Sequence, residues 1–137
     1  MDYKIAVESD NQDVFTQVRK GLRAFNQSFI GPGNQPVAIS LRDLDGSLIG
    51  GCLGAVFADM LAIDILWIEE SCRGGGIGTE LLGSIEVEGK RLGATKAVLD
   101  TFQFQAKGFY EKQGYVEFGR IEDCAAGFDR FYMLKRL

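Results

Sequence analysis

Histidine is missing from the 137-residue sequence, and cysteine is scarce. The lack of histidine excludes Ser-His and Cys-His nucleophilic pairs and metal sites built on imidazole. The three cysteines, Cys52, Cys72 and Cys124, are an odd number without close pairing, so neither a disulfide framework nor a zinc site is expected. Any chemistry must therefore use carboxylates, tyrosine, backbone amides or a bound cofactor, and we expect no metal.

Long apolar runs and basic clusters are missing as well. No stretch approaches the roughly 20 apolar residues that span a bilayer, so no membrane partner is expected. The net charge of −4 argues against a nucleic-acid partner, which needs a basic surface. The first residues do not show a basic segment followed by an apolar one, which predicts a cytoplasmic location. The length and the apolar share of 46% predict one globular domain over residues 1–137.

Hydrophobic periodicity predicts an α/β fold with a mixed, mostly antiparallel central sheet and flanking helices. A near-continuous apolar run over residues 61–68 (LAIDILWI) is typical of a central strand buried on both faces. Breaks are expected at residues 31–34, 45–47 and 58–59. The predicted order is β-α-β-β-β-α-β-α-β-β, with strands at 3–7, 37–42, 48–57, 61–68, 96–101, 115–121 and 130–134, and helices at 11–29, 77–91 and 106–112.

A glycine-rich loop follows the central strand and opens the second helix. Glycines let several backbone N–H groups point into one concavity, and the helix N-terminus adds a partial positive charge. With Arg73 beside it, the segment predicts a phosphate cradle, although a flexible glycine turn before a core helix is the plainer interpretation. A P-loop fits worse because Gly78-Thr79-Glu80 has no lysine. A dinucleotide fingerprint is weakened because Thr79 or Leu81 stands where its third glycine belongs.

Two segments resemble the GCN5-related N-acetyltransferases (GNAT). Arg73-x-x-Gly76-x-Gly78 matches the Arg/Gln-x-x-Gly-x-Gly/Ala signature, and the apolar strand end Leu66-Trp67-Ile68 precedes it by five residues. Downstream, the run AKGFYEKQGY over residues 106–115 is similar to the family's Ala-x-x-aromatic-Tyr-Glu-Lys-x-Gly-aromatic segment. The order and spacing of the two matches also fit. The resemblance covers roughly residues 48–120, and the N-terminal part only by element order.

The resemblance implies a set of residues for binding acetyl-CoA. The strand over Leu66–Ile68 would part from its neighbour and pair with the pantetheine amides. Gln103 stands where many relatives have an asparagine that touches the cofactor, and Lys112 is either near the phosphates or a solvated helix lysine. The residues implied for the cofactor are Leu66, Trp67, Ile68, Arg73, Gly74, Gly75, Gly76, Ile77, Gly78, Thr79, Gln103, Ala106, Phe109, Tyr110 and Lys112.

The resemblance also implies direct transfer of acetyl from acetyl-CoA to a primary amine in a ternary complex. Tyr110, at the family's tyrosine position, would protonate the departing thiolate, unless it is a core-packing tyrosine. The backbone N–H of Ile68 would stabilise the oxyanion. Asp64 shares strand parity with Leu66 and Ile68, and we interpret it as a water-mediated base or an anchor for the amine. A paired structural aspartate is the alternative, because a buried carboxylate needs a partner.

Other functions stay open at this stage. A catalytically weak acyl-CoA-binding or sensory module could use the same fold, and a nucleotide-phosphate binder could use the same loop. The acceptor would be a small-molecule or peptide amine, bordered by the loops at residues 31–35 and 122–129. A homodimer is common in such families.

Overall fold

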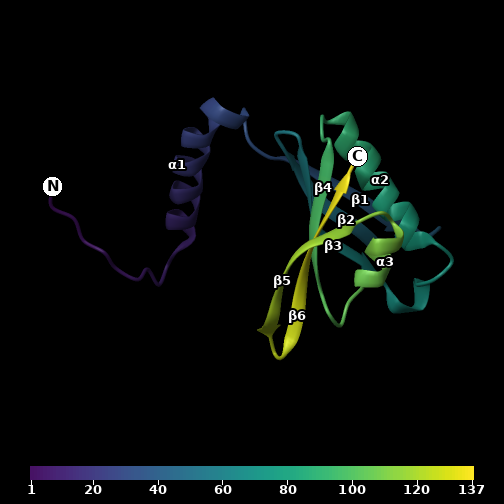
Figure 1. Cartoon of the computed structure of the whole chain (residues 1–137). Helices are drawn as coiled ribbons and strands as arrows, with labels where there is room; N and C mark the ends of the chain where they lie inside the picture. The colour runs from purple at the N-terminus through teal and green to yellow at the C-terminus, as the bar shows by residue number, and fades with distance from the viewer. The chain divides into compact units, whose positions relative to one another are not determined.

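The computed structural model describes residues 1–137 as two compact units, Met1–Gly33 and Asn34–Leu137. Figure 1 shows the elements of both units along the chain. The first unit contains a single helix, α1 (Gln12–Ile30), and the second contains the whole sheet and the two other helices. No helix combines the length and the apolar character that crossing a membrane requires.

The helix predicted over residues 11–29 is confirmed as α1, with Asn11 at its N-cap position. The strand predicted over residues 3–7 is wrong, because that segment has no regular structure and its side chains are exposed. Tyr3, Ile5 and Val7 alternate as a strand would, but a strand needs a neighbour to satisfy its backbone hydrogen bonds. The alternating pattern of residues 3–7 is typical of a strand, but no neighbouring strand is there to pair with it.

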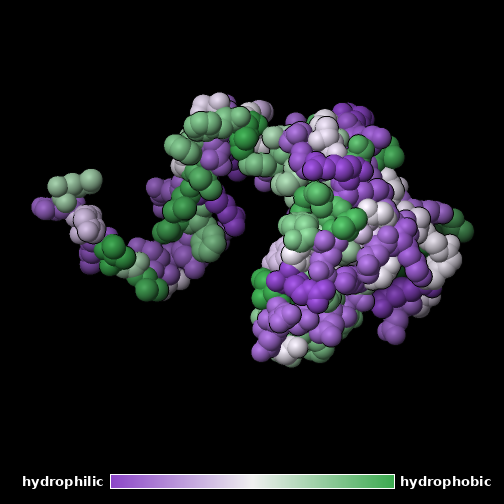
Figure 2. All heavy atoms as spheres, in the orientation of Figure 1, coloured by the Kyte–Doolittle hydropathy of each residue, from purple (hydrophilic) through white to green (hydrophobic).

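Helix α1 carries an apolar stripe along its length. Figure 2 shows hydrophobic residues gathered along this helix. The exposed large hydrophobic residues of the stripe are Val14, Phe15, Val18, Leu22, Phe25 and Phe29. Their spacing of three and four residues gives the helix a strongly amphipathic character.

The second unit is built on a six-stranded sheet in the order β1-β2-β3-β4-β6-β5. Every neighbouring pair of strands is antiparallel except β3 and β4, which are parallel, so the predicted mixed, mostly antiparallel sheet is confirmed. The strands are β1 (Gln35–Arg42), β2 (Leu48–Phe57), β3 (Met60–Ile68), β4 (Lys96–Phe102), β5 (Val116–Ala125) and β6 (Phe128–Arg136).

Two helices, α2 (Ile77–Arg91) and α3 (Lys107–Lys112), pack on one face of this sheet, and a short 3₁₀ turn, Glu70–Cys72, precedes α2. The core joins α2 to the middle strands, where Leu82, Ile85 and Leu61 are almost completely buried. Gly89 lets α2 approach β3 closely, since a Cβ there would lie 2.8 Å from Leu61 Cδ2.

A buried polar group ties α2 to the far end of the sheet. Glu86, only 9% exposed, accepts a hydrogen bond of 2.8 Å from the Tyr115 hydroxyl. It also accepts one of 3.0 Å from Lys135 Nζ on β6. Burial and the hydrogen bond to Glu86 raise the pKa of Tyr115 above its usual range, so this phenol stays protonated as the donor.

Strand β3 departs from the predicted burial on both faces. Leu61 and Ile63 are buried, but Asp64, Ile65 and Trp67 are exposed. The cause is a bulge, because Gly54 of β2 faces Ile63 and Leu53 faces Ile65, which leaves Asp64 as the extra residue. The bulge shifts the alternation by one, so Leu66 and Ile68 join Leu61 and Ile63 in packing against the core.

Candidate acyl-CoA site

Strands β3 and β4 part from each other after only three residue pairs. Met60, Leu61 and Ala62 pair with Lys96, Ala97 and Val98, and the rest of β3 has no neighbour on that edge. The strand ends therefore diverge and open a gap in the middle of the sheet. The parting that the resemblance implied is present in the structure.

The backbone groups of Leu66 and Ile68 point into this gap. Glu69 N donates to Ile49 O at 2.9 Å, which makes these two residues a hydrogen-bonded pair with β2. Antiparallel partners alternate between bonded and non-bonded pairs, so Ile68 and Leu66 direct their N–H and C=O groups away from β2. One edge of the gap thus offers unpaired main-chain donors and acceptors.

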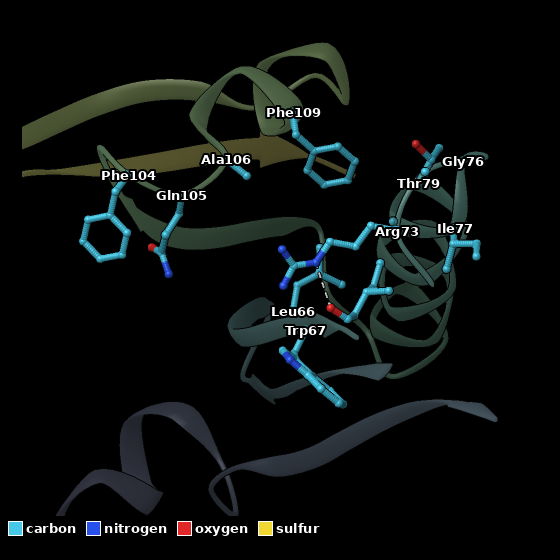
Figure 3. A pocket seen from close by; sticks show the side chains of 13 residues that line it. Leu66, Trp67, Arg73, Gly76, Ile77, Thr79, Phe104, Gln105, Ala106 and Phe109 are labelled. Atoms are coloured by element: carbon cyan, nitrogen blue, oxygen red, sulfur yellow. Dashed lines mark hydrogen bonds between the residues drawn. The ribbon is translucent and has the colours of Figure 1, made fainter. Parts of the chain in front are cut away.

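Arg73 closes the end of β3. Its Nε donates a hydrogen bond of 2.9 Å to Ile68 O, drawn as a dashed line in Figure 3. One carbonyl of the open edge is thereby satisfied, and the Ile68 N–H stays available. The contact also holds the charged guanidinium beside the gap, where Figure 3 shows it among the lining residues.

The glycine loop adopts a conformation that other residues rarely reach. Gly74, Gly75 and Gly76 have φ angles of 95°, 66° and 85°, and Gly76 is the N-cap of α2. These φ values are ones that residues with a Cβ rarely adopt, and the loop leads directly into the free N–H donors of the first helical turn. The geometry suits an anion such as a phosphate or diphosphate.

Contacts from α3 hold the start of α2 in place. A Cβ on Gly78 would lie 3.3 Å from the Phe109 ring, so the glycine allows the aromatic ring to approach the helix. Thr79 Oγ1 accepts a hydrogen bond of 3.1 Å from Gln113 Nε2. The two motifs found in the sequence are therefore packed directly against each other.

The gap, the loop and α3 enclose a cavity of about 620 Å³. This volume lies within the usual range for small-molecule sites. Figure 3 shows Gly76, Ile77 and Thr79 around the N-terminus of α2, with Phe104 and Gln105 on the β4 side. The lining residues are Leu66, Trp67, Ile68, Arg73, Gly74, Gly76, Ile77, Gly78, Thr79, Phe104, Gln105, Ala106 and Phe109.

Two of the lining residues, Phe104 and Gln105, were missed by sequence reasoning. Gln105 Oε1 accepts a hydrogen bond of 2.7 Å from Phe102 N and so fixes the turn that follows β4. Their position between Gln103 and Ala106, both proposed from the resemblance, was the only signal in the sequence. For loop residues outside a motif, the sequence does not show whether a side chain faces the cavity.

Several proposed residues lie outside the lining. Gly75 belongs to the loop, and Lys112 is an exposed residue at the end of α3. Gln103 is turned toward β6, since its N donates to Asp129 O at 2.9 Å and its Oε1 accepts from Asp129 N at 3.1 Å. The amide of Gln103 is thus occupied in joining the end of β4 to β6.

Tyr110 is not among the lining residues, although its neighbour Phe109 is. It is 9% exposed, and its ring packs edge-to-face on Phe109 at 5.1 Å and on Tyr115 at 5.9 Å. Burial, followed by the nearby Cys52 and Asp100, raises the pKa of Tyr110 from 10.0 to about 12. The phenol is therefore protonated throughout the physiological pH range.

Asp64 lies at the bulge of β3 and is exposed. The expectation that it is the buried charge of a two-sided central strand is wrong. The parity argument also fails, because the alternation that would relate Asp64 to Leu66 and Ile68 is interrupted at Asp64 itself. The bulge nevertheless puts this carboxylate on the strand that lines the gap, two residues before Leu66.

Comparison with known proteins agrees with this geometry. A sequence model of the acetyltransferase (GNAT) family matches residues 5–115. A blasticidin-S acetyltransferase from Streptomyces morookaense is 33% identical over 93 residues, which are 67% of this chain and 68% of that protein. A crystal structure of an acetyltransferase from Bacillus cereus is 31% identical and covers 97% of this chain and 98% of its own, with a TM-score of 0.85. A nourseothricin acetyltransferase, 21% identical, shares the fold with a TM-score of 0.65 over 74% of this chain and 65% of its own.

The fold and these relatives together define an acetyltransferase. The chain belongs to the acetyltransferase (GNAT) family and is an N-acetyltransferase.

Proposed function

We propose that this protein transfers an acetyl group from acetyl-CoA directly to a primary amine within a ternary complex. The observation that carries the proposal is the parting of β3 and β4 beside the glycine loop at the start of α2. The diphosphate of acetyl-CoA requires several N–H donors that point toward it. The amides of the pantetheine arm require backbone N–H and C=O groups that are free to form hydrogen bonds. The loop and the open edge of β3 offer both within one cavity.

The residues present fit acetyl-CoA as a co-substrate. The amides from Gly74 to Gly78 and the hydroxyl of Thr79 would bind the diphosphate, assisted by the helix N-terminus. The Arg73 N–H is already donated to Glu70 O, so Arg73 would contribute through its side chain. Leu66 and Ile68 would hydrogen-bond the pantetheine amides, and Phe109 and Ala106 would pack against its chain. The thioester carried by this co-substrate supplies the activated acyl group.

The chain would supply two polar functions at the reacting thioester. The Ile68 N–H would donate to the oxyanion as negative charge develops on the carbonyl oxygen. Tyr110, which packs against the lining residue Phe109, would donate its proton to the departing sulfur. Asp64 would receive the proton of the amine through water or hold the amine near the gap, and its exposed position favours contact with an incoming acceptor.

We propose that the acceptor is a small molecule. A relative that is 33% identical over 93 residues is a blasticidin-S acetyltransferase, and that protein is named for a small-molecule acceptor. We also propose that both compact units serve one domain, since the family match at residues 5–115 extends across both.

Thiol release from acetyl-CoA with a panel of amines tests the proposal. We expect turnover with at least one amine, and we expect Tyr110→Phe to lower kcat about 10²- to 10⁴-fold, the range that a general acid contributes. The affinity for acetyl-CoA, measured by calorimetry, should not change. Tyr115→Phe is the matched control, because it removes a neighbouring phenol that is already bonded to Glu86.

Two results would contradict the proposal in different ways. Tight acetyl-CoA binding without turnover of any amine would indicate a binding or sensory module. Undetectable acetyl-CoA binding would mean that the cavity is not an acetyl-CoA site.

A further inference from the structure

We propose that the acceptor is a small amine bearing a planar unsaturated ring, and that Phe104 and its aromatic neighbours bind that ring. The inference rests on the proposed function, because it assigns the acceptor half of the same site. It concerns the sheet face opposite α2 and α3.

Residues from both sides of β3 line the cavity. Ile77 and Phe109 approach it from the helix side, whereas Trp67 belongs to the other side of β3. Trp67 also lines a second, apolar hollow of about 290 Å³ on that face, together with Ile65 and Leu53. An acetyl-CoA diphosphate bound at the start of α2 occupies the helix side. An acceptor would then approach the thioester from the opposite face.

An aromatic cluster stands where the gap opens on this face. In β4 the buried residues Ala97, Leu99 and Thr101 face the helices, so Phe102 faces away from them. The Phe104 ring stacks on Phe102 with centroids 5.4 Å apart and planes 12° from parallel. Phe128, at the start of β6, meets Phe104 edge-on at 4.9 Å. Phe104 is thus both a cavity-lining residue and the centre of this cluster.

The cluster is rigid at its base and open at its surface. Arg130 lies opposite Phe102, with its guanidinium 5.3 Å from the Phe102 ring and 2.6 Å from Asp100 Oδ2. These contacts fix Phe102 from one side. Phe104 remains 61% exposed and Phe128 41% exposed, so ring surface is left for a ligand.

The surface of the cluster itself is aromatic. Asp100 is paired with Arg130, and the carboxylate of Asp129, next to Phe128, accepts a hydrogen bond from Asp123 N. What remains is flat, apolar aromatic surface on the β4 side, and the indole of Trp67, 47% exposed, on the β3 side. Aromatic surfaces of this kind bind planar rings by offset or edge-on stacking.

The test compares benzylamine with cyclohexylmethylamine as acceptors at fixed acetyl-CoA. These amines differ in the planarity of a six-membered ring. We expect Phe104→Ala and Phe128→Ala each to lower the ratio of their kcat/KM values by about 3- to 10-fold, as loss of an aromatic contact predicts. The two amines differ in basicity, but this difference is the same for every variant and drops out when the ratios of the variants are compared. The affinity for acetyl-CoA of Phe128→Ala, which lies outside the cavity lining, should not change.

Phe118→Ala is the matched control, because Phe118 is also 61% exposed but belongs to β5, outside the cluster. An unchanged ratio in both cluster variants, or an equal change in the Phe118 variant, would overturn the inference while leaving the N-acetyltransferase proposal intact. Turnover of spermidine with no turnover of either ring amine would overturn it as well. Failure of all amines, ring-bearing or not, would instead count against the proposed function.

Discussion

Gly78 is a residue whose missing side chain sets how closely two motifs approach each other. It lies in the first turn of α2, and an added Cβ would press on the Phe109 ring at 3.3 Å. Contacts this short force the neighbour to move, and here the neighbour forms the cavity wall.

We expect Gly78→Val to weaken acetyl-CoA binding about tenfold or more, because displacing Phe109 narrows the cavity beside the diphosphate cradle. Calorimetry with acetyl-CoA measures the effect. Gly83→Ala is the control in the same helix. A Cβ there meets nothing within 4 Å, so this change should keep the affinity and stabilise α2 by about 0.5–1 kcal/mol. Equal affinities of the two variants would contradict the role of Gly78.

Tyr110 also affects stability at alkaline pH. Its pKa is raised to about 12 in the folded chain, against an ordinary value of 10.0. Between these values the unfolded chain has released the proton that the folded chain retains, so the free energy of unfolding falls as pH rises. The stabilising effect is complete below about pH 10 and is lost toward pH 12.

We therefore expect Tyr110→Phe to have a shallower loss of stability above about pH 10 than the unsubstituted protein. Urea unfolding at a series of pH values measures this slope. Tyr132→Phe serves as a comparison, because Tyr132 is a partly exposed phenol on β6 away from the core. A steeper alkaline loss in the Tyr110 variant would contradict the linkage.

Helix α2 shows how one element serves both stability and function. Its N-terminus lines the cavity, its apolar side fills the core, and Glu86 ties it to Tyr115 and Lys135 near the end of the chain. A buried carboxylate with two partners stabilises the fold only while the network is complete.

We expect Glu86→Ala to destabilise the protein by about 3 kcal/mol, since it leaves a lysine and a buried hydroxyl without their acceptor. Glu86→Gln should cost less because its carbonyl can still accept a hydrogen bond from Tyr115. Chemical denaturation gives both values. Glu88→Ala is the control in the same helix. Its ion pair with Arg91 is at the surface, so its loss should destabilise the protein much less than Glu86→Ala does. Similar losses at both positions would argue against a special role for the buried network.

The elements of the second unit could be predicted from the sequence because their signals are local. Residues 77–91 carry both the helical spacing and the glycine boundary, and the structure confirms these bounds for α2. The loop at the start of α2 could be predicted from the glycines at 74–78 in the same way. The bulge at Asp64 could not be predicted, because it depends on how β2 and β3 align, and one inserted residue reverses every later side chain. The turn of Gln103 toward Asp129 depends likewise on a strand that comes 26 residues later.

At the scale of the whole molecule, the core and the cavity belong to one unit. Every residue of the core cluster and every lining residue lies within Asn34–Leu137. The first unit has an amphipathic helix whose residues include none that are buried.

We therefore expect the chain of residues 34–137 to unfold cooperatively and to bind acetyl-CoA when residues 1–33 are removed. Thermal unfolding with and without acetyl-CoA measures both properties. The full chain measured in parallel is the control. Loss of cooperative unfolding would mean that the first unit contributes to the core, and loss of binding alone would mean that it contributes to the site.

The separation of β3 and β4 also affects how fast backbone amide hydrogens exchange with solvent. Three residue pairs join a half-sheet of β1, β2 and β3 to another of β4, β6 and β5. A pantetheine chain laid along the open edge would act as a removable strand, so the amide hydrogens of Leu66 and Ile68 would exchange quickly without it and slowly with it. Acetyl-CoA at about a hundred times its Kd would raise the free energy of unfolding by about 2.7 kcal/mol. Bound acetyl-CoA would then join the edges of β3 and β4 in each catalytic cycle, and product release would leave them unpaired again.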